Sequence, residues 1–548
     1  MTARLETPVL IAGAGPVGLA LAMDLAWRGI EATVVEKRAR AAPPPPKCNH
    51  VSARTMEIFR RLGVAGKLRN AGLPADYPND VSYRTCFTGP ELARIPIPCR
   101  RDRYIATDGP DTDWPTPEPP HRINQIFLEP ILFDHAAQMP RLHILCETEL
   151  EAVDYGDDGA RARARDLKTG EPLIVDCRYL VGCDGGSSLV RKAIGARLHG
   201  DPVVQRAQSS FIRAPALIGL QREERAWATF SLNPRRSGNV YAIDGRETWI
   251  VHNYLRPGEE DFAAIDRDWA IRTILGVDDS FEYEIIAKED WFGRRLVADR
   301  FRDGPVFICG DAAHIWVPYG GYGINTGVAD AANLAWLLAA HLNGWAGPAI
   351  LDAYEAERLP ITHQVSHFAM DHAHAMANQR GSVPANLEED SPAGAAARAE
   401  LGARAYDLNV QQYCCAGLNF GYYYDRSPIV AYDGAAHPPY SMAGYTPSTV
   451  PGCRAPHFWL GEGRSFYDAL GPEYTLVRFD RSAEVSTILS AARDKQFPLA
   501  MLDAEGLASV PAPDRLLIVR PDQHVAWRGD EEPGDPGRLL DKLAGRGG

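Results

Sequence analysis

The sequence has few cysteines for its length, and no two of them stand in the Cys-x-x-Cys spacing. Ten cysteines are scattered over 548 residues, so neither a disulfide framework nor a cysteine zinc site is indicated. Residues 454–548 contain no cysteine, which excludes dithiol chemistry from the last part of the chain. This usage predicts a reducing, cytoplasmic compartment.

The chain also lacks an excess of positive charge and long apolar runs. Its formal net charge is −13, so no basic field would attract a nucleic acid partner. No stretch has the length and apolarity of a membrane span, no signal peptide is separable, and we expect no membrane partner. His363 and His367 share a helical face, but no carboxylate or cysteine completes a tetrahedral set, so we predict no metal site.

The length and patterning indicate several domains. Helical and strand-like patterns alternate up to residue 199, whereas strand-like runs separated by turns prevail in residues 200–290. We therefore predict an α/β nucleotide-binding domain in two parts, 1–199 and 291–380, around an inserted, mostly antiparallel substrate sheet of residues 200–290. A linker, residues 381–445, is predicted to lead to a separate unit, residues 446–548.

The N-terminal segment carries a dinucleotide fingerprint. An apolar strand, Pro8–Ala12, is followed by Gly13-Ala14-Gly15-Pro16-Val17-Gly18, a helix, and a second strand that ends in Glu36. Gly13 permits the tight turn, Gly15 lets a pyrophosphate approach the backbone, and Gly18 lets helix and strand pack closely. Glu36 is placed to accept hydrogen bonds from an adenosine ribose.

A second nucleotide-type turn lies far along the chain, within Val306–Trp336. An apolar strand breaks at Gly310-Asp311, a glycine-rich loop runs from Pro318 to Gly327, and apolar residues then recur at helical spacing. Strand, glycine loop and helix place a helix N-terminus against a group that approaches the backbone closely. The two turns together predict one large, partly anionic ligand, FAD.

These motifs resemble those of the class A flavoprotein aromatic hydroxylases, the para-hydroxybenzoate hydroxylase and phenol hydroxylase family of FAD-dependent monooxygenases. The resemblance covers about residues 5–375 and rests on three motifs, which are Gly13–Gly18 with Glu36, Gly182-Cys183-Asp184-Gly185 with Arg191, and Gly310-Asp311-Ala312-Ala313-His314 with Pro318 and Gly320–Asn325. It implies a Rossmann-like FAD-binding domain with an inserted substrate sheet. The last unit is similar to the redox-inactive thioredoxin-like domain of the phenol hydroxylase branch, which often sits at subunit contacts, and we expect a homodimer.

The resemblance also implies cofactor contacts at matching positions. Asp311 would bond the ribityl chain, and the loop from Pro318 to Asn325 would lie against the isoalloxazine, with a helix N-terminus near N1 and O2. Lys47 stands where many relatives have arginine near the pyrophosphate, and it keeps the charge without the bidentate fork. The full implied set is Gly13, Ala14, Gly15, Gly18, Glu36, Lys47, Gln125, Asp184, Asp311, Pro318, Gly323, Ile324 and Asn325.

The implied reaction is the hydroxylation of a phenolic compound. Tightly bound, non-covalent FAD would be reduced by NADPH or NADH and would react with O2 to give the flavin C4a-hydroperoxide. An electron-rich ring would attack its distal oxygen, ortho to an existing hydroxyl. No second nucleotide fingerprint appears, which suits this family and leaves the choice of nicotinamide cofactor open. Displacement of a nitro or halide substituent by the same chemistry also stays open.

The substrate side of the site is predicted from residue chemistry. A phenolate is a better nucleophile than a phenol, so a base near the substrate hydroxyl would help. His50, in the flavin-facing stretch of the family, is our candidate because its unperturbed pKa lies near working pH. A histidine hydrogen-bonded within a loop is an equally open interpretation. Aromatic contacts are predicted at Phe230, Tyr241 and Trp249, of which strand alternation sends only some inward.

Two other classes of function stay open on the sequence. A pyridine-nucleotide dehydrogenase without flavin would use Gly13–Glu36 for NAD(H), but it would leave Asp311–Asn325 unexplained. A non-catalytic flavin-binding or interaction protein would use the C-terminal unit as a partner module.

Overall fold

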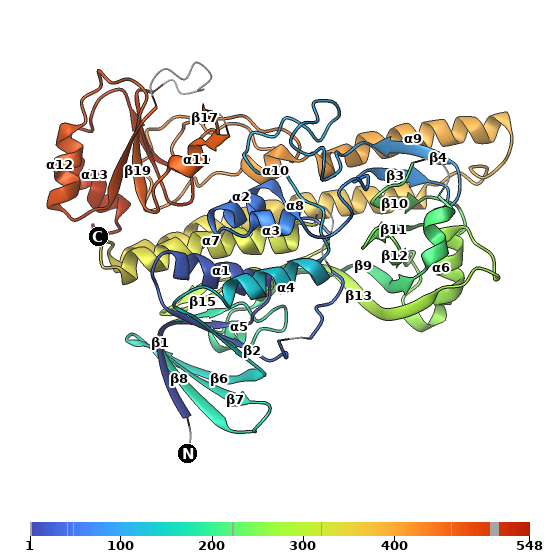
Figure 1. The fold of residues 1–548 in the computed structure, drawn as a ribbon, viewed down its shortest axis with the longest axis horizontal. Helices are drawn as coiled ribbons and strands as arrows, with labels where there is room; N and C mark the ends of the chain where they lie inside the picture. Colours follow the sequence, from blue (N-terminus) through green and yellow to red (C-terminus); the bar gives the residue numbers. More distant parts are fainter. Residues whose placement is uncertain are drawn as a thin grey trace.

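The structure, a computed structural model, describes residues 3–40, 42–47, 49–221, 224–318, 321–461, 463–504 and 514–547. Within these residues the chain forms two eight-stranded sheets and a C-terminal unit with a four-stranded sheet. Figure 1 shows the first sheet at the lower left, the second at the right and the C-terminal unit at the upper left, with long helices between them. No helix of this described part is long and apolar enough to cross a membrane.

The first sheet brings three motifs to one edge. β1 pairs in parallel with β2 and β8, and β15 pairs in parallel with β8, so that Ala12, Gly182 and Ile308 stand in register at the strand ends. The segments that follow β1, β8 and β15 therefore meet at the carboxyl edge of the sheet. The strands are β1 (Ala3–Ala12), β2 (Ala32–Glu36), β5 (Leu142–Cys146), β6 (Thr148–Gly156), β7 (Gly159–Asp166), β8 (Pro172–Gly182), β14 (Arg302–Asp303) and β15 (Val306–Ile308).

The second sheet is antiparallel except between β3 and β10, so it is a mixed sheet. Its strands are β3 (Val81–Arg84), β4 (Glu91–Ile95), β9 (Leu198–Arg213), β10 (Ala228–Ser231), β11 (Gly238–Ala242), β12 (Thr248–Tyr254), β13 (Glu284–Ala298) and β16 (His314–Trp316). β3 and β4 reach this sheet from the first part of the chain. The segment 200–290 thus supplies most of the sheet, and the boundaries given above stay predictions.

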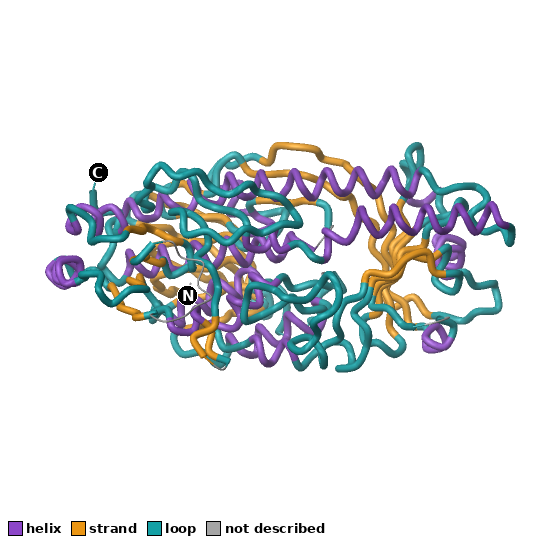
Figure 2. The backbone as a smooth tube through the Cα atoms, turned by 90° about the horizontal axis from the view of Figure 1, so that it is seen from above, coloured by secondary structure: helices purple, strands orange, loops and turns teal. Residues whose placement is uncertain are grey.

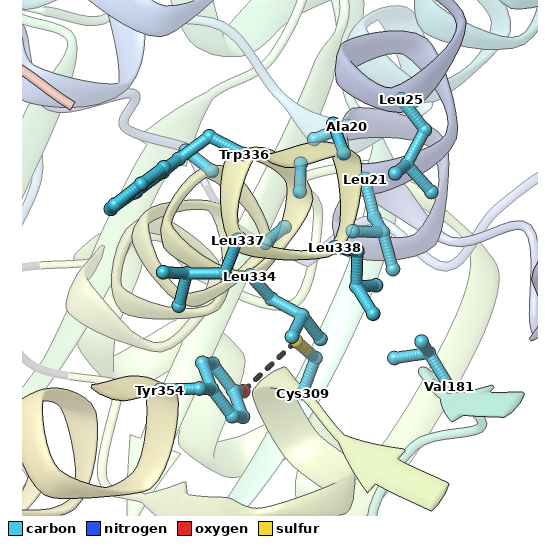
Figure 3. Packing of buried hydrophobic residues seen from close by; sticks show 14 of the residues in the cluster. Ala20, Leu21, Leu25, Val181, Cys309, Leu334, Trp336, Leu337, Leu338 and Tyr354 are labelled. Atoms are coloured by element: carbon cyan, nitrogen blue, oxygen red, sulfur yellow. Dashed lines mark hydrogen bonds between the residues drawn. The ribbon is translucent and has the colours of Figure 1, made fainter. Parts of the chain in front are cut away.

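Most of the long helices lie between the sheets, while α6 (Arg267–Leu275) covers the outer face of the second sheet (Figure 1). The helices outside the C-terminal unit are α1 (Pro16–Trp27), α2 (Ala53–Arg61), α3 (Ala65–Arg69), α4 (Gln125–Ala136), α5 (Leu189–Ala193), α6, α7 (Tyr322–Leu342), α8 (Asp352–Gly381), α9 (Pro392–Tyr413) and α10 (Ala416–Phe420). α7 packs against α1 and is buried on nearly all sides, as its apolar sequence requires. Figure 3 shows this packing, with Leu334, Leu337 and Leu338 of α7 near Leu21 of α1, and with the Cys309–Tyr354 contact beneath.

The segment 381–445 differs from the linker that the sequence predicts, because it contains the 22-residue helix α9. Ser391 caps this helix by accepting from the Gly394 N–H, and Pro392 begins it. The alanine-rich sequence that follows favours a helix. α9 packs on β4 so closely that a Cβ at Gly402 would overlap the Leu92 carbonyl oxygen. α8 and α9 lie side by side at the end of the molecule that holds the second sheet (Figure 2).

The C-terminal unit has the strand order β20-β19-β21-β22, in which β19 and β20 are parallel and the other pairs are antiparallel. A helix joins the two parallel strands, and another follows the final hairpin. Its elements are β17 (Trp459–Gly461), β18 (Arg464–Ser465), α11 (Phe466–Ala469), β19 (Tyr474–Arg478), α12 (Ser486–Asp494), β20 (Leu499–Asp503), β21 (Leu516–Val519), β22 (Val525–Gly529) and α13 (Pro536–Leu543).

A buried charge network attaches this unit to the helices. Arg520, after β21, donates to both carboxylate oxygens of Glu357 on α8 at 2.6 and 2.8 Å, and to Asp522 at 2.8 Å. Asn333 on α7 donates to Glu357 at 2.7 Å. Nearby, Arg454 and Arg54 flank Glu57 on α2. Burial alone would raise the pKa of Glu57, but these two guanidinium groups outweigh it and hold the pKa below its usual range.

We predict that Glu357→Gln lowers the free energy of unfolding by on the order of 3 kcal/mol, because it leaves the Arg520 guanidinium buried with one carboxylate instead of two. Urea unfolding followed by circular dichroism measures this loss. Asp503→Asn is the matched control, since its ion pair with Arg478 lies at the surface, and its effect should stay within about 1 kcal/mol. Equal losses in the two variants would contradict the interpretation.

Candidate functional site

In the glycine turn after β1, Gly13 and Gly18 have no room for a side chain, whereas the space beside Gly15 is open. Gly13 has φ +102°, and a Cβ there would overlap the Cys183 carbonyl oxygen, while a Cβ at Gly18 would overlap the Gly13 carbonyl oxygen. At Gly15, in contrast, no atom lies within 4 Å of the Cβ position. Since Gly15 is the N-cap of α1, an open helix N-terminus faces this space, which suits a pyrophosphate.

Glu36 and Gln125 are joined by a chain of charged side chains. One oxygen of Glu36 accepts from the Ala14 N–H at 2.8 Å, and the other accepts from the backbone N–H and the Nε of Arg38 at 2.9 and 3.1 Å. Arg38 also donates to Glu129 at 2.6 Å, and Glu129 accepts from the Gln125 amide at 2.9 Å. Arg38 and Glu129 were missed by the sequence analysis, although a basic residue two positions after Glu36 was a visible signal.

Asp184 caps α5 at the same sheet edge. Its Oδ2 accepts from the Leu189 and Val190 N–H groups at 2.7 and 3.2 Å, while its buried Oδ1 has no hydrogen-bond partner among the described residues. Arg191 donates to the carbonyl oxygens of Ala312 and Gly186. The bond to Ala312 thereby attaches the Gly182–Gly185 motif with Arg191 to the Gly310–His314 motif.

Asp311 follows β15 on the side of the sheet edge that faces solvent. Desolvation by the adjacent protein raises the pKa of this carboxyl group, opposed by the charges of His314 and Lys47. Lys47 pairs with Glu289 of the second sheet at 2.8 Å. Lys47 therefore stands near Asp311 and ties the segment after β2 to the second sheet, while its predicted contact with a pyrophosphate stays a prediction.

His314, Asp330 and Arg358 form a buried triad that the sequence analysis did not predict. The Nε2 of His314 lies 2.6 Å from Asp330 Oδ2, and Arg358 Nε donates to Asp330 Oδ1 at 2.8 Å. Burial would raise the pKa of Asp330, but Arg358 and His314 outweigh it and lower the pKa. The triad fixes the loop after β15 to α7 and α8.

The first turn of α7 is tied to the His50 segment through Asn325. Asn325 accepts from the Ser52 N–H at 2.9 Å and donates to the His50 carbonyl oxygen at 3.1 Å. Pro318 is exposed and accepts from the Gly321 N–H at 3.1 Å. Gly320, part of the predicted flavin loop, lies outside the described residues. Gly323 and Ile324, in the first turn of α7, are half-buried.

His50 is buried against this loop, since a Cβ at Gly321 would stand 3.1 Å from the His50 Cβ. Burial lowers the pKa of His50 well below its usual value, and the charges of Arg122 and Arg103 lower it further. A guanidinium nitrogen of Arg122 contacts the His50 Nδ1. Because a guanidinium can only donate, the neutral ring accepts at Nδ1 and carries its proton on Nε2. Its role as a substrate base stays a prediction.

Strand register divides the predicted aromatic contacts between two faces of the second sheet. Phe230 pairs with Asn239 and Tyr241 pairs with Ala228, so Phe230 and Tyr241 share one face. Trp249 pairs with Ala242 and therefore lies on the other face. Its indole packs on Phe87 and donates to the Ala214 carbonyl oxygen at 3.2 Å. The structure does not bring Trp249 to the other two, because strand alternation turns it into the core beneath α6, and its contact with the substrate stays a prediction.

The face that carries Phe230 and Tyr241 also holds residues that the sequence analysis did not select. Trp227 lies 5.3 Å from Tyr241, ring centroid to centroid. The Arg122 guanidinium stands 4.8 Å from the Trp227 ring centroid and 5.6 Å from that of Tyr413. Tyr413 comes from α9, in the segment predicted to be a linker, so no local signal pointed to it.

Comparison with known proteins agrees with this geometry. Residues 6–369 match the model of an FAD binding domain, and residues 448–546 match that of the aromatic-ring hydroxylase C-terminal domain. The FAD-dependent monooxygenase apdD of Emericella nidulans is 31% identical over 95% of this chain and 87% of its own. Phenol 2-monooxygenase of a Pseudomonas species is 30% identical over 98% and 93%. The structure of RebC, a rebeccamycin biosynthetic enzyme, with bound 7-carboxy-K252c superposes with a TM-score of 0.89 at 34% identity over both whole chains.

These matches identify an FAD-dependent monooxygenase. The open helix N-terminus at Gly15 and the meeting of three motifs at one sheet edge agree with that class. The chain belongs to the FAD-binding aromatic-ring hydroxylase family, which includes phenol 2-monooxygenase. The predicted family and the predicted enzyme class are confirmed, as is FAD as the cofactor. The flavin-free dehydrogenase is thereby excluded.

We predict that Gly15→Asp weakens FAD binding at least tenfold, about 1.4 kcal/mol, because it places a negative charge in the open space where a pyrophosphate would lie. The backbone should tolerate the side chain, since nothing lies within 4 Å of its Cβ. Titration of the apoprotein with FAD, followed by flavin fluorescence, measures the affinity. Gly15→Asn is the matched uncharged control, and equal loss in both variants would argue against charge repulsion.

We predict that His50→Gln slows hydroxylation about a hundredfold, within the range of a lost general base. The lowered pKa keeps His50 neutral below the usual 6.5, so the wild-type rate should hold as pH falls through that value and decline only at lower pH. Single-turnover rates across pH measure both effects, with His367→Gln as the control. A His50→Gln rate that is unchanged across pH would exclude the base role.

Proposed function

We propose that the protein hydroxylates a phenolic aromatic compound ortho to an existing hydroxyl, consuming NAD(P)H and O2. The observation that carries this proposal is the shared aromatic face of Trp227, Phe230 and Tyr241, which Arg122 connects to His50 and thus to the start of α7. A flat aromatic ring between that face and the flavin loop would be in contact with both.

The chain would hold FAD at three places along the converging edge. Gly15 and the N-terminus of α1 would bind the pyrophosphate, Glu36 the ribose, and Asp311 the ribityl chain. The N-terminus of α7, entered through Gly321, would lie at the flavin ring, where a positive helix end stabilises negative charge. Bound FAD supplies the activation of O2 for transfer to the ring.

His50 and Arg122 would act on the substrate oxygen. A neutral His50 can exchange a proton with a phenol at Nε2, while the adjacent guanidinium favours the ionised form. The low pKa of His50 makes it a weak base in isolation, so the positive charge of Arg122 is what would make phenol ionisation favourable at this place.

The remaining proposals concern the whole protein. The βαβ unit and hairpin of residues 474–529 support a thioredoxin-like C-terminal fold, and its lack of cysteine supports a redox-inactive one. We propose a homodimer on the resemblance to the phenol hydroxylase branch. The free cysteines of the described chain suit a reducing, cytoplasmic compartment.

The test is a panel of phenols, hydroxyphenyl acids and halogenated or nitrated phenols, scored for accelerated NADPH or NADH oxidation. We expect at least one compound to accelerate oxidation and to gain one oxygen by mass. Release of nitrite or halide would identify the displacement reaction instead of ortho hydroxylation. Oxidation that no aromatic compound accelerates would support a non-catalytic flavin-binding protein and refute the proposal.

A further inference from the structure

Arg122 is a buried cation without a carboxylate partner. Its side chain is 4% exposed, and no acidic side chain forms an ion pair with it in the described part of the chain. One terminal nitrogen contacts His50, and the other, Nη2, is buried without a hydrogen-bond partner. A buried guanidinium in this state is costly unless an anion completes the site.

Asp111, the acidic group nearest to Arg122, already has hydrogen-bond partners for its carboxylate. Both carboxylate oxygens of Asp111 are engaged, Oδ2 by Arg103 at 2.7 Å and Oδ1 by the Trp114 indole N–H at 2.8 Å. Arg122 and Arg103 are thus two guanidinium groups beside one carboxylate, that of Asp111. This leaves one uncompensated positive charge.

The other titratable groups around Arg122 do not cancel this charge. Burial lowers the pKa of His121, as it does that of His50, so both rings are neutral at neutral pH. Burial raises the pKa of Tyr322 well above its usual value and that of the Cys415 thiol to about 11. Neither group is an anion at neutral pH. Burial also raises the pKa of the Cys414 thiol, and Tyr413 is a phenol whose ring lies beneath the guanidinium.

The position of Arg122 is that of a substrate-binding residue. It lies along the ring of Trp227, on the sheet face of Tyr241, and its other contact is His50, which packs against Gly321 at the start of α7. The cation–π contacts with Trp227 and Tyr413 are attractive. They hold the guanidinium flat, but they give Nη2 no acceptor.

We propose that Arg122 binds an oxyanion on the aromatic substrate, and that this protein therefore selects aromatic compounds with an ionised phenol or a carboxylate over neutral ones. The inference rests on the function proposed above and names its substrate class. A planar guanidinium held by two aromatic rings suits an oxygen atom in the plane of a bound ring. The same charge would keep that oxygen ionised beside His50.

The test uses the FAD-loaded protein without NAD(P)H and two pairs of probes, 4-nitrophenol with 4-nitroanisole and benzoate with benzamide. Calorimetric titration at a pH where the nitrophenol is ionised gives the four dissociation constants. We expect at least one oxyanion to bind tenfold or more tightly than its neutral partner. The pair that shows the preference distinguishes a phenolate site from a carboxylate site.

Two variants assign the preference to Arg122. Arg122→Gln should bring the ratio of the two constants close to one, and Arg122→Lys should retain part of it, since lysine keeps the charge but loses the fork. Arg40→Gln, a surface change, should leave the ratio as in the wild type. The absorbance of bound nitrophenolate adds a second readout, because bound nitrophenol should ionise at lower pH than free nitrophenol, and this shift should disappear in Arg122→Gln.

Several outcomes would overturn the inference. These are equal binding of oxyanions and neutral partners, no binding of either oxyanion, or an unchanged ratio in Arg122→Gln. A loss of FAD affinity in both Arg122 variants would show that Arg122 binds the cofactor instead. If Arg122→Gln does not fold, Arg122→Lys serves instead. A reduced ratio of dissociation constants and a reduced ionisation shift in Arg122→Lys would support the inference, and wild-type values of both would overturn it. A neutral phenol that is hydroxylated as well as an anionic one refutes this inference and leaves the proposed function standing, whereas failure of every aromatic compound in the panel refutes the proposed function.

Discussion

The parallel pairing of β1, β8 and β15 is the constraint on which the site depends. Parallel strands deliver the segments that follow them to one edge, so three turns from distant parts of the chain meet there. Gly13 and Gly18 have no room for a side chain because β1, α1 and β8 approach so closely. Gly15 stays open at the N-terminus of α1. The cofactor cradle thus follows from strand pairing together with three glycines.

Buried charges hold the remaining parts around this edge. Asp330 fixes the loop after β15 through His314 and Arg358, and Glu357 fixes the C-terminal unit through Arg520. In both cases the carboxylates are matched by guanidinium groups, as burial requires. Arg122 differs from Arg358 and Arg520, because no carboxylate of the described residues pairs with it and nearby Asp111 is engaged by Arg103 and Trp114.

The local geometry of the three motifs was largely predictable, because its requirements lie within short stretches of sequence. A glycine where the backbone turns, an acidic residue at a strand end and a helix start can each be found in a short window of sequence. The substrate half was predictable only in part. Alternation predicts that only some of the three aromatic residues share a face, and strand register decides that Phe230 and Tyr241 do and that Trp249 does not. The position of Tyr413 beside Arg122 could not be predicted, because the sequence predicts a linker where α9 forms.

By itself the sequence determined the FAD-binding fold, the family and the positions of the cofactor motifs, because glycine geometry, strand ends and helix starts are properties of neighbouring residues. Only the tertiary structure decided which aromatic side chains share one face of the second sheet, which charges are compensated and how the C-terminal unit is attached. Those features join residues hundreds of positions apart, such as Arg54 with Asp522 and Arg122 with Tyr413. No local pattern encodes such pairs, since they form only when the sheets and helices pack.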